Sequence, residues 1–306
     1  MPSSCASSSA LRILVSHSPG NTALERSLRQ AFPQAFIACL AYEPAGPVSK
    51  EADEIHVMPY PVAGAQAWLD RLDQVLAETG ATLLIPTLEA EVEMLSGLLP
   101  ELARRGLATC LPDEQMLSRR ANYRLSELAL NCNVPVPDTR AVYGILGAVR
   151  AATAFGYPVM VKGPCHETCK ARNEPEFISA SIHLLAEWGA PAIVQRCVRG
   201  GTCSMVGIGD GQGGAHGCRC LLKPCQQPGE NDGSLPDLES LCHRLIEDLQ
   251  WRGPFEIEVI RDEDDDDALC LTAFRPCFPA WMEEDAELAA LLLETMGGRA
   301  VKAVES

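Results

Sequence analysis

Residues 156–164, Gly-Tyr-Pro-Val-Met-Val-Lys-Gly-Pro, combine a turn, a short apolar run and a single lysine. The pattern predicts a strand that begins after the turn and carries Lys162 at its end. Upstream, residues 133–139 (Asn-Val-Pro-Val-Pro-Asp-Thr) must be extended, because each proline fixes its own φ and keeps its predecessor out of the helical region. Downstream, residues 174–188 have a helical pattern and residues 192–195 have the pattern of a buried strand.

The remaining elements are predicted by the same reasoning on both sides of this stretch. Residues 12–111 alternate short apolar runs with helical patterns, which favours an α/β domain with parallel strands in a doubly wound arrangement. Residues 118–132 predict one helix. Further along, the sequence predicts two pairs of antiparallel strands. The first pair comprises residues 205–208 and 217–222, and the second comprises residues 255–260 and 268–274. Between the two pairs, residues 239–249 predict a helix.

Length and charge narrow the possible classes of protein. The chain has 306 residues, which suits two or three compact units. The chain has 25 Lys and Arg residues and 41 Asp and Glu residues, so its net charge is −16. Most of its surface would therefore repel a polyanion, which makes nucleic acid and anionic membranes poor partners. No run of about 18 uncharged apolar residues predicts a membrane span.

The N-terminus and the cysteines indicate the compartment. Residues 1–11 are Ser-rich, without a basic start or an apolar run, and predict a disordered tail and not a signal peptide. The 14 cysteines, in a chain without an export signal, indicate reduced thiols and a cytoplasmic protein. The sequence predicts no oligomeric state.

Three passages together resemble the ATP-grasp superfamily, in particular its carboxylate–amine ligase-like and carbamoyl-phosphate-synthetase-like members. These passages are residues 133–139, residues 156–164, and residues 253–260 (Gly-Pro-Phe-Glu-Ile-Glu-Val-Ile) with residues 278–281 (Phe-Pro-Ala-Trp). Members of this superfamily hold ATP between two small sheets and use Mg²⁺ to activate a carboxylate as an acyl phosphate, which an amine then displaces.

The resemblance also implies a domain organisation. A doubly wound pre-ATP-grasp domain is expected over residues 12–115. A two-lobed α+β ATP-grasp domain follows over residues 116–290, with lobes of about 116–195 and 196–290. Residues 291–306 are expected to form a C-terminal helix or tail.

The resemblance assigns nucleotide-binding roles residue by residue. Lys162 takes the place of the strand-borne phosphate lysine. The second family lysine aligns with Asn122, so its charge is lost, although Arg120 or Arg124 could reach inward. The hinge around the adenine aligns with residues 194–198 (Val-Gln-Arg-Cys-Val), which makes Gln195, Arg196 and Val198 candidate nucleotide contacts, with Arg196 replacing an acidic residue. The ribose-binding acidic residue falls near Thr202.

The metal ligands depart furthest from the family pattern. Glu258 matches the first family carboxylate, and Glu256 lies on the same strand face. The second motif, Glu-x-Asn-Pro-Arg, aligns with residues 273–277 (Ala-Phe-Arg-Pro-Cys). Ala273 has no ligand atom, and the Arg275 guanidinium offers only donors and would repel Mg²⁺. The sequence therefore predicts a degenerate site with Glu258 as the remaining metal ligand.

Two functions follow from this pattern. In the first, the cleft still binds ATP, with Lys162, Arg196 and Arg275 as fixed cations in place of magnesium. If ligation persists, Lys162 holds phosphate, Glu258 holds the only metal and Arg275 is the catalytic residue that stabilises the acyl phosphate. The substrate would be a small-molecule carboxylate or a peptide. In the second, the chain is a pseudoenzyme that acts as a binding or scaffolding module for a protein partner.

Two further motifs offer smaller alternatives. Cys165-His166-x-x-Cys169 and Cys218-x-Cys220-x₄-Cys225 could form a soft-metal or redox site, although neither has common zinc spacing. Residues 262–267 (Asp-Glu-Asp-Asp-Asp-Asp) lack the ligand spacing of a calcium loop and predict a solvated turn between two strands.

Overall fold

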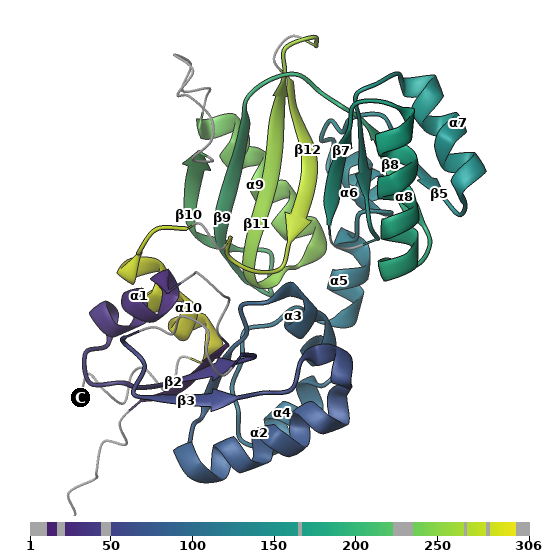
Figure 1. The fold of residues 1–306 in the computed structure, drawn as a ribbon. Coiled ribbons are helices and arrows are strands. Elements are labelled where there is room, and N and C mark those ends of the chain that lie inside the picture. Colours follow the sequence, from purple (N-terminus) through teal and green to yellow (C-terminus); the bar gives the residue numbers. More distant parts are fainter. Residues whose placement is uncertain are drawn as a thin grey trace, which may run out of the picture.

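A computed structural model of the protein contains three four-stranded sheets (Figure 1). The structure describes residues 11–16, 22–43, 50–164, 167–222, 235–265, 268–279 and 282–297. The first ten residues of the predicted tail, residues 298–306, and Cys165, His166 and Cys225 of the cysteine motifs lie outside the described residues. No described helix is long and apolar enough to cross a membrane.

The first sheet is parallel and has the strand order β3-β2-β1-β4. Alternate residues of β1 point to opposite faces, so Ile13 packs with Leu24 and Leu28 of α1, whereas Leu14 packs with Trp68 and Leu72 of α2. Helices therefore cover both faces of this sheet. The elements are β1 (Arg12–Ser16), α1 (Ala23–Ala31), β2 (Phe36–Ala41), β3 (Glu54–Val57), the 3₁₀ helix η1 (Pro61–Ala63), α2 (Ala65–Thr79), β4 (Leu83–Ile85), α3 (Glu89–Ser96) and α4 (Leu99–Arg104).

Two short helices connect this sheet to the rest of the chain. The prediction of one helix over residues 118–132 is wrong, because the structure has α5 (Glu114–Arg120) and α6 (Leu125–Asn131). A hydrogen bond to a distant segment fixes the turn between α5 and α6, because the backbone N–H of Asn122 donates to the carbonyl of Pro164 at 2.9 Å. That tertiary contact replaces the helical hydrogen bonds that the local pattern predicts.

The small sheet has the order β5-β8-β6-β7 and carries Lys162 at the end of β6. All its strand pairs are antiparallel, and helices α7 and α8 pack on one face, around the fully buried Phe177. The elements are β5 (Thr139–Val142), α7 (Ile145–Phe155), β6 (Val159–Lys162), β7 (Thr168–Ala171), α8 (Glu174–Trp188) and β8 (Ala192–Arg196).

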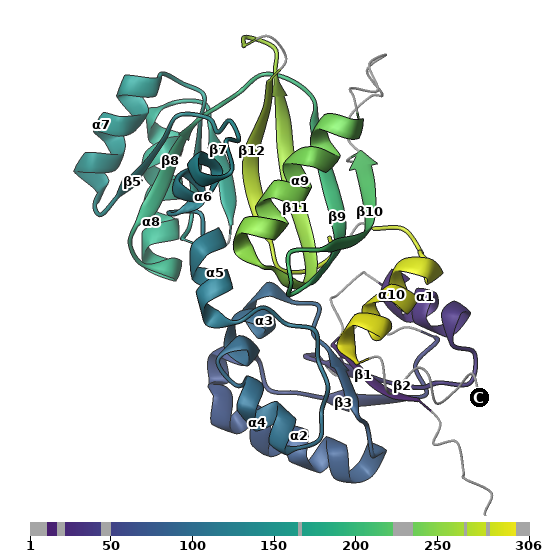
Figure 2. The same cartoon turned by 180° about the vertical axis from the view of Figure 1, so that it is seen from behind.

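The large sheet is antiparallel, with the order β10-β9-β11-β12, which confirms the two predicted strand pairs. Helix α9 lies against this sheet (Figures 1 and 2). Along β11, Phe255, Ile257 and Val259 share a buried cluster with residues of α9, so Glu256 and Glu258 lie on the opposite face. The elements are β9 (Thr202–Asp210), β10 (Ala215–Leu222), α9 (Leu235–Leu249), β11 (Arg252–Asp262) and β12 (Ala268–Arg275).

The last helix returns to the first sheet. Helix α10 (Ala286–Met296) begins five residues before the predicted boundary at 291, because the side chain of Asp285 caps it by accepting from the backbone N–H of Leu288 at 2.8 Å. Its apolar face joins one buried cluster with α1, β1 and residues Val206 and Ile208 of β9. Helix α10 therefore ties the large sheet to the N-terminal unit (Figure 2).

Replacing Asp285 by alanine should lower the free energy of unfolding by about 1 kcal/mol, because the N-cap acceptor is lost. Urea titration followed by circular dichroism measures the change. Glu283→Ala is the control, since Glu283 is exposed and lies outside the helix, and it should change stability by less than about 0.5 kcal/mol. Equal effects of the two substitutions would contradict the capping role.

Candidate functional site

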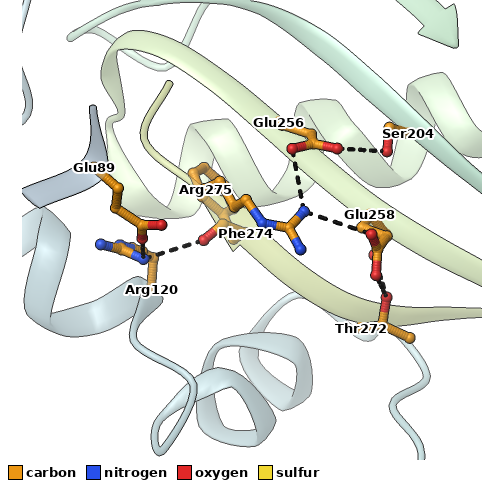
Figure 3. A network of polar contacts seen from close by, with 8 residues as sticks. All are labelled: Glu89, Arg120, Ser204, Glu256, Glu258, Thr272, Phe274 and Arg275. Atoms are coloured by element: carbon orange, nitrogen blue, oxygen red, sulfur yellow. Dashed lines mark hydrogen bonds and ion pairs between the residues drawn. The ribbon is translucent and has the colours of Figure 1, made fainter. Parts of the chain in front are cut away.

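The polar face of the large sheet gathers two carboxylates around one guanidinium (Figure 3). Residue Arg275 pairs with Glu256 across β11 and β12. Its Nη1 atom lies 3.1 Å from Glu256 Oε2 and 3.5 Å from Glu258 Oε2. One nitrogen thus contacts both acidic side chains.

Neighbouring hydroxyls hold both carboxylates in place. The buried Ser204 donates to Glu256 Oε1 at 2.8 Å, and Thr272 donates to Glu258 Oε1 at 3.0 Å. Burial lowers the pKa of Arg275, but the Glu256 and Glu258 carboxylates outweigh this effect and raise it above the ordinary arginine value. The guanidinium is therefore a permanent cation at this place.

This arrangement does not fit Mg²⁺. Magnesium requires oxygen ligands at about 2.0–2.1 Å in octahedral geometry, and a guanidinium supplies none. Arg275 stands between the two carboxylates that could share such an ion, and it excludes the ion by volume and by charge. Among the described residues, no group of three or more His, Cys, Asp or Glu side chains could hold a metal ion.

Residue Lys162 connects the small sheet to the same network. Its side chain is only 4% exposed, and its Nζ atom donates to the backbone carbonyl of Thr272 at 2.6 Å. Because Thr272 also bonds Glu258, a continuous chain of polar contacts runs from the small sheet to Arg275. The predicted residues Lys162, Glu258 and Arg275 are brought together at one place.

Residue Asn122 lies beside the end of the lysine strand. Its Nδ2 atom donates to the carbonyl of Gly163 at 3.1 Å, and its backbone N–H donates to Pro164. The side chain therefore holds the loop that follows Lys162. Arg124, the other nearby cation, pairs with Glu127 on its own helix.

The predicted hinge lies at the end of β8, but two of its side chains have partners of their own. Gln195 donates to Thr139 Oγ1 at 3.0 Å. Arg196 pairs with Asp262 at 2.9 Å, and Asp262 is only 1% exposed, so the expectation that residue 262 belongs to a solvated turn is wrong. The backbone N–H of the buried Val198 has no hydrogen-bond partner in the described part of the chain.

A second buried guanidinium lies where the N-terminal unit meets the site. Arg120, 2% exposed, pairs with Glu89 of α3 and donates to the carbonyl of Phe274 at 3.4 Å (Figure 3). It also pairs with Glu93 of the same helix. Cys277 lies near this group, and burial raises the pKa of its thiol to about 12, so it adds no charge. The sequence indicates Arg120 as a cation that could reach into the site, but it does not predict the ion pairs with Glu89 and Glu93.

Comparison with known proteins agrees with this architecture. No protein-family model matches the chain, and no curated protein sequence matches it. Solved structures do match. The biotin carboxylase domain of 2-oxoglutarate carboxylase from Hydrogenobacter thermophilus, solved with MgADP, ADP and bicarbonate, aligns with a TM-score of 0.69 at 16% identity, over 94% of this chain and 69% of that one.

Two other matches come from different enzymes. N5-carboxyaminoimidazole ribonucleotide synthetase from Thermotoga maritima aligns with a TM-score of 0.64 at 14% identity, covering 92% of this chain and 76% of its own. An L-amino acid ligase from Bacillus licheniformis aligns with a TM-score of 0.64 at 9% identity, covering 88% and 67%. The chain therefore has the ATP-grasp fold.

Proposed function

We propose that the protein binds a nucleoside triphosphate, such as ATP, between the small and large sheets without a divalent metal. Lys162 and Arg275 are the cations that face the phosphates. The observation that carries this proposal is the position of Arg275, whose Nη1 contacts both Glu256 and Glu258. A protein cation takes the place between two carboxylates where a magnesium-dependent relative would need the ion.

The charges of the site support this proposal. Two bare carboxylates would repel a triphosphate, but Lys162 and Arg275 balance Glu256 and Glu258. The Nε and Nη2 groups of Arg275 have no hydrogen-bond partner among the described residues, so they are available as donors to phosphate oxygens. Lys162 can exchange the Thr272 carbonyl for a phosphate oxygen, which is a stronger, charge-assisted acceptor.

The same geometry argues against efficient ligation. Loss of a metal Lewis acid removes several kcal/mol of stabilisation from phosphoryl transfer, which corresponds to orders of magnitude in rate. We therefore propose a non-catalytic or very slow nucleotide-binding protein that descends from ATP-dependent carboxylate–amine ligases. A second candidate is metal-free ligation, in which the donors of Arg275 stabilise an acyl phosphate of a small carboxylate or a peptide.

Nucleotide binding is expected to depend on Lys162. Replacing it by alanine removes a charge-assisted contact, so ATP affinity measured by calorimetry in EDTA should fall by about 10- to 100-fold. Lys170→Ala is the matched control, since Lys170 is exposed on neighbouring β7. An unchanged affinity of the Lys162 variant, or no ATP binding by the unaltered protein, would refute the proposal.

The cysteines support a reducing compartment, such as the cytoplasm. Every cysteine that the structure describes is a free thiol. Disulfides of structural importance would be expected in an exported protein with this many cysteines.

A further inference from the structure

Strand β3 ends the first sheet, and among the described residues β2 is the only strand that pairs with it (Figure 1). The backbone N–H of Met58, directly after β3, donates to the carbonyl of Ala41 at 2.8 Å, so Met58 faces β2. Because peptide groups alternate along a strand, those of Ile55 and Val57 point to the outer edge. An edge of this kind is a template for pairing with another strand.

The two faces of β3 differ in character. Ile55 is 52% exposed and Val57 is 41% exposed, and they form an apolar row on one face. Glu54 and His56 lie on the other face, which α2 covers, because His56 Nδ1 lies 3.3 Å from a carboxylate oxygen of Glu78 on that helix. The outer edge therefore combines an apolar row with a charged row.

We propose that the protein forms a two-fold symmetric dimer in which the β3 strands of two copies pair antiparallel and join their sheets. The register that fits places Ile55 opposite Val57 of the second copy. Both residues point their peptide groups outward, so each such pair can exchange two N–H···O hydrogen bonds, and the two-fold axis generates the pair twice. The exposed apolar side chains of both copies then lie on one face of the joined sheet and cover one another.

The charges on the α2 face are complementary in the same register. Arg71 of α2 donates from Nε to the Val57 carbonyl at 3.0 Å. Position 58 of one copy lies opposite position 54 of the other, so Arg71 reaches Glu54 of the second copy. This carboxylate is a stronger, charge-assisted acceptor, and the exchange frees the Val57 carbonyl for Ile55 of the second copy.

The two-fold axis passes between the two copies of His56. Both ring nitrogens of this side chain already lie near carboxylates of their own chain, because Nε2 is 3.1 Å from Glu54 Oε2 and Nδ1 is near Glu78. Glu54 has a second carboxylate oxygen, which is suitable for Arg71 of the other copy. A strand with the sequence of β3 thus satisfies the apolar row and the charged row together, which identifies a second copy of this chain as the partner.

This dimer does not depend on nucleotide binding. Strand β3 belongs to the unit built on the first sheet, whereas Lys162 and Arg275 lie between the other two sheets (Figure 1). Loss of the dimer and loss of ATP binding are therefore separate results.

Size-exclusion chromatography with light scattering, on the full chain at about 50 µM, tests the proposal. Salt at about 0.15 M screens the net charge of −16. We expect twice the chain mass of 33.0 kDa for the unaltered protein. Val57→Lys should give the monomer with unchanged circular dichroism, because an edge lysine blocks strand pairing. Ile182→Lys is the control and should stay dimeric, since Ile182 is 56% exposed on α8 of the small lobe.

Charge reversal tests the register. Glu54→Arg and Arg71→Glu should each raise the dimer dissociation constant at least about tenfold, because like charges then face each other. An equal mixture of these two variants should associate as tightly as the unaltered protein, since every arginine again faces a carboxylate, and sedimentation velocity measures all these affinities. A monomeric unaltered protein, which would also result if another segment or a different protein covers β3, would overturn the proposal. A dimer that survives Val57→Lys, or a mixture that fails to associate, would do the same.

Discussion

Replacing Arg275 by asparagine is expected to make nucleotide binding dependent on Mg²⁺. The substitution removes the cation between Glu256 and Glu258 and leaves two carboxylates beside an amide oxygen, which are the hard ligands that magnesium prefers. In EDTA, the uncompensated carboxylates should lower ATP affinity by at least about tenfold, since a charge-assisted contact is lost and repulsion is gained. Millimolar Mg²⁺ should restore the affinity.

The charge-preserving variant Arg275→Lys is the control for this change. It keeps a cation near both carboxylates, so its binding should stay insensitive to Mg²⁺ even if it is weaker. Calorimetric titrations of both variants with ATP, in EDTA and in Mg²⁺, give the four affinities required. A metal response in neither variant would show that the two carboxylates do not form a latent metal site.

Replacing Arg120 by methionine is expected to lower the free energy of unfolding by about 3–5 kcal/mol. Methionine keeps most of the volume, but Glu89 and Glu93 lose the cation that balances them at a buried position. The donor to the Phe274 carbonyl is also lost. Because α3 belongs to the N-terminal unit and Phe274 to β12, the variant should also loosen the junction between the two units.

The neighbouring Arg124→Met provides the comparison. Arg124 pairs with Glu127 on an exposed helical face, where solvent screening leaves a single ion pair little effect on stability. Urea unfolding of both variants, followed by tryptophan fluorescence, measures the difference. Similar destabilisation by the two substitutions would mean that the Arg120 network contributes no more than a surface ion pair.

The sequence identifies the residues of the site only where a single local segment determines their position. Lys162, Glu258 and Arg275 are candidates because they align with motif positions of the ATP-grasp superfamily, which the sequence resembles, and each of these motifs is a short local segment. Glu256 was recognised only as a neighbour on the same face. Its role depends on the register of β11 against β12, which places Arg275 opposite it, and register is a tertiary property.

Contacts between distant segments explain the remaining differences. The break after α5 depends on hydrogen bonds from Asn122 to residues 163 and 164, which no local pattern indicates. Asp262 begins a run of acidic residues that is typical of a solvated turn, yet Arg196 from β8 pairs with it in a buried position. In both cases a partner far away in sequence outweighs the local preference.

The central claim is that a protein cation replaces magnesium in this cleft. The most direct measurement is a calorimetric titration of the unaltered protein with ATP, once in EDTA and once in millimolar Mg²⁺. We expect binding under both conditions, with dissociation constants within about threefold of each other, which is below 1 kcal/mol. Binding that requires Mg²⁺, or that Mg²⁺ strengthens by tenfold or more, would contradict the claim.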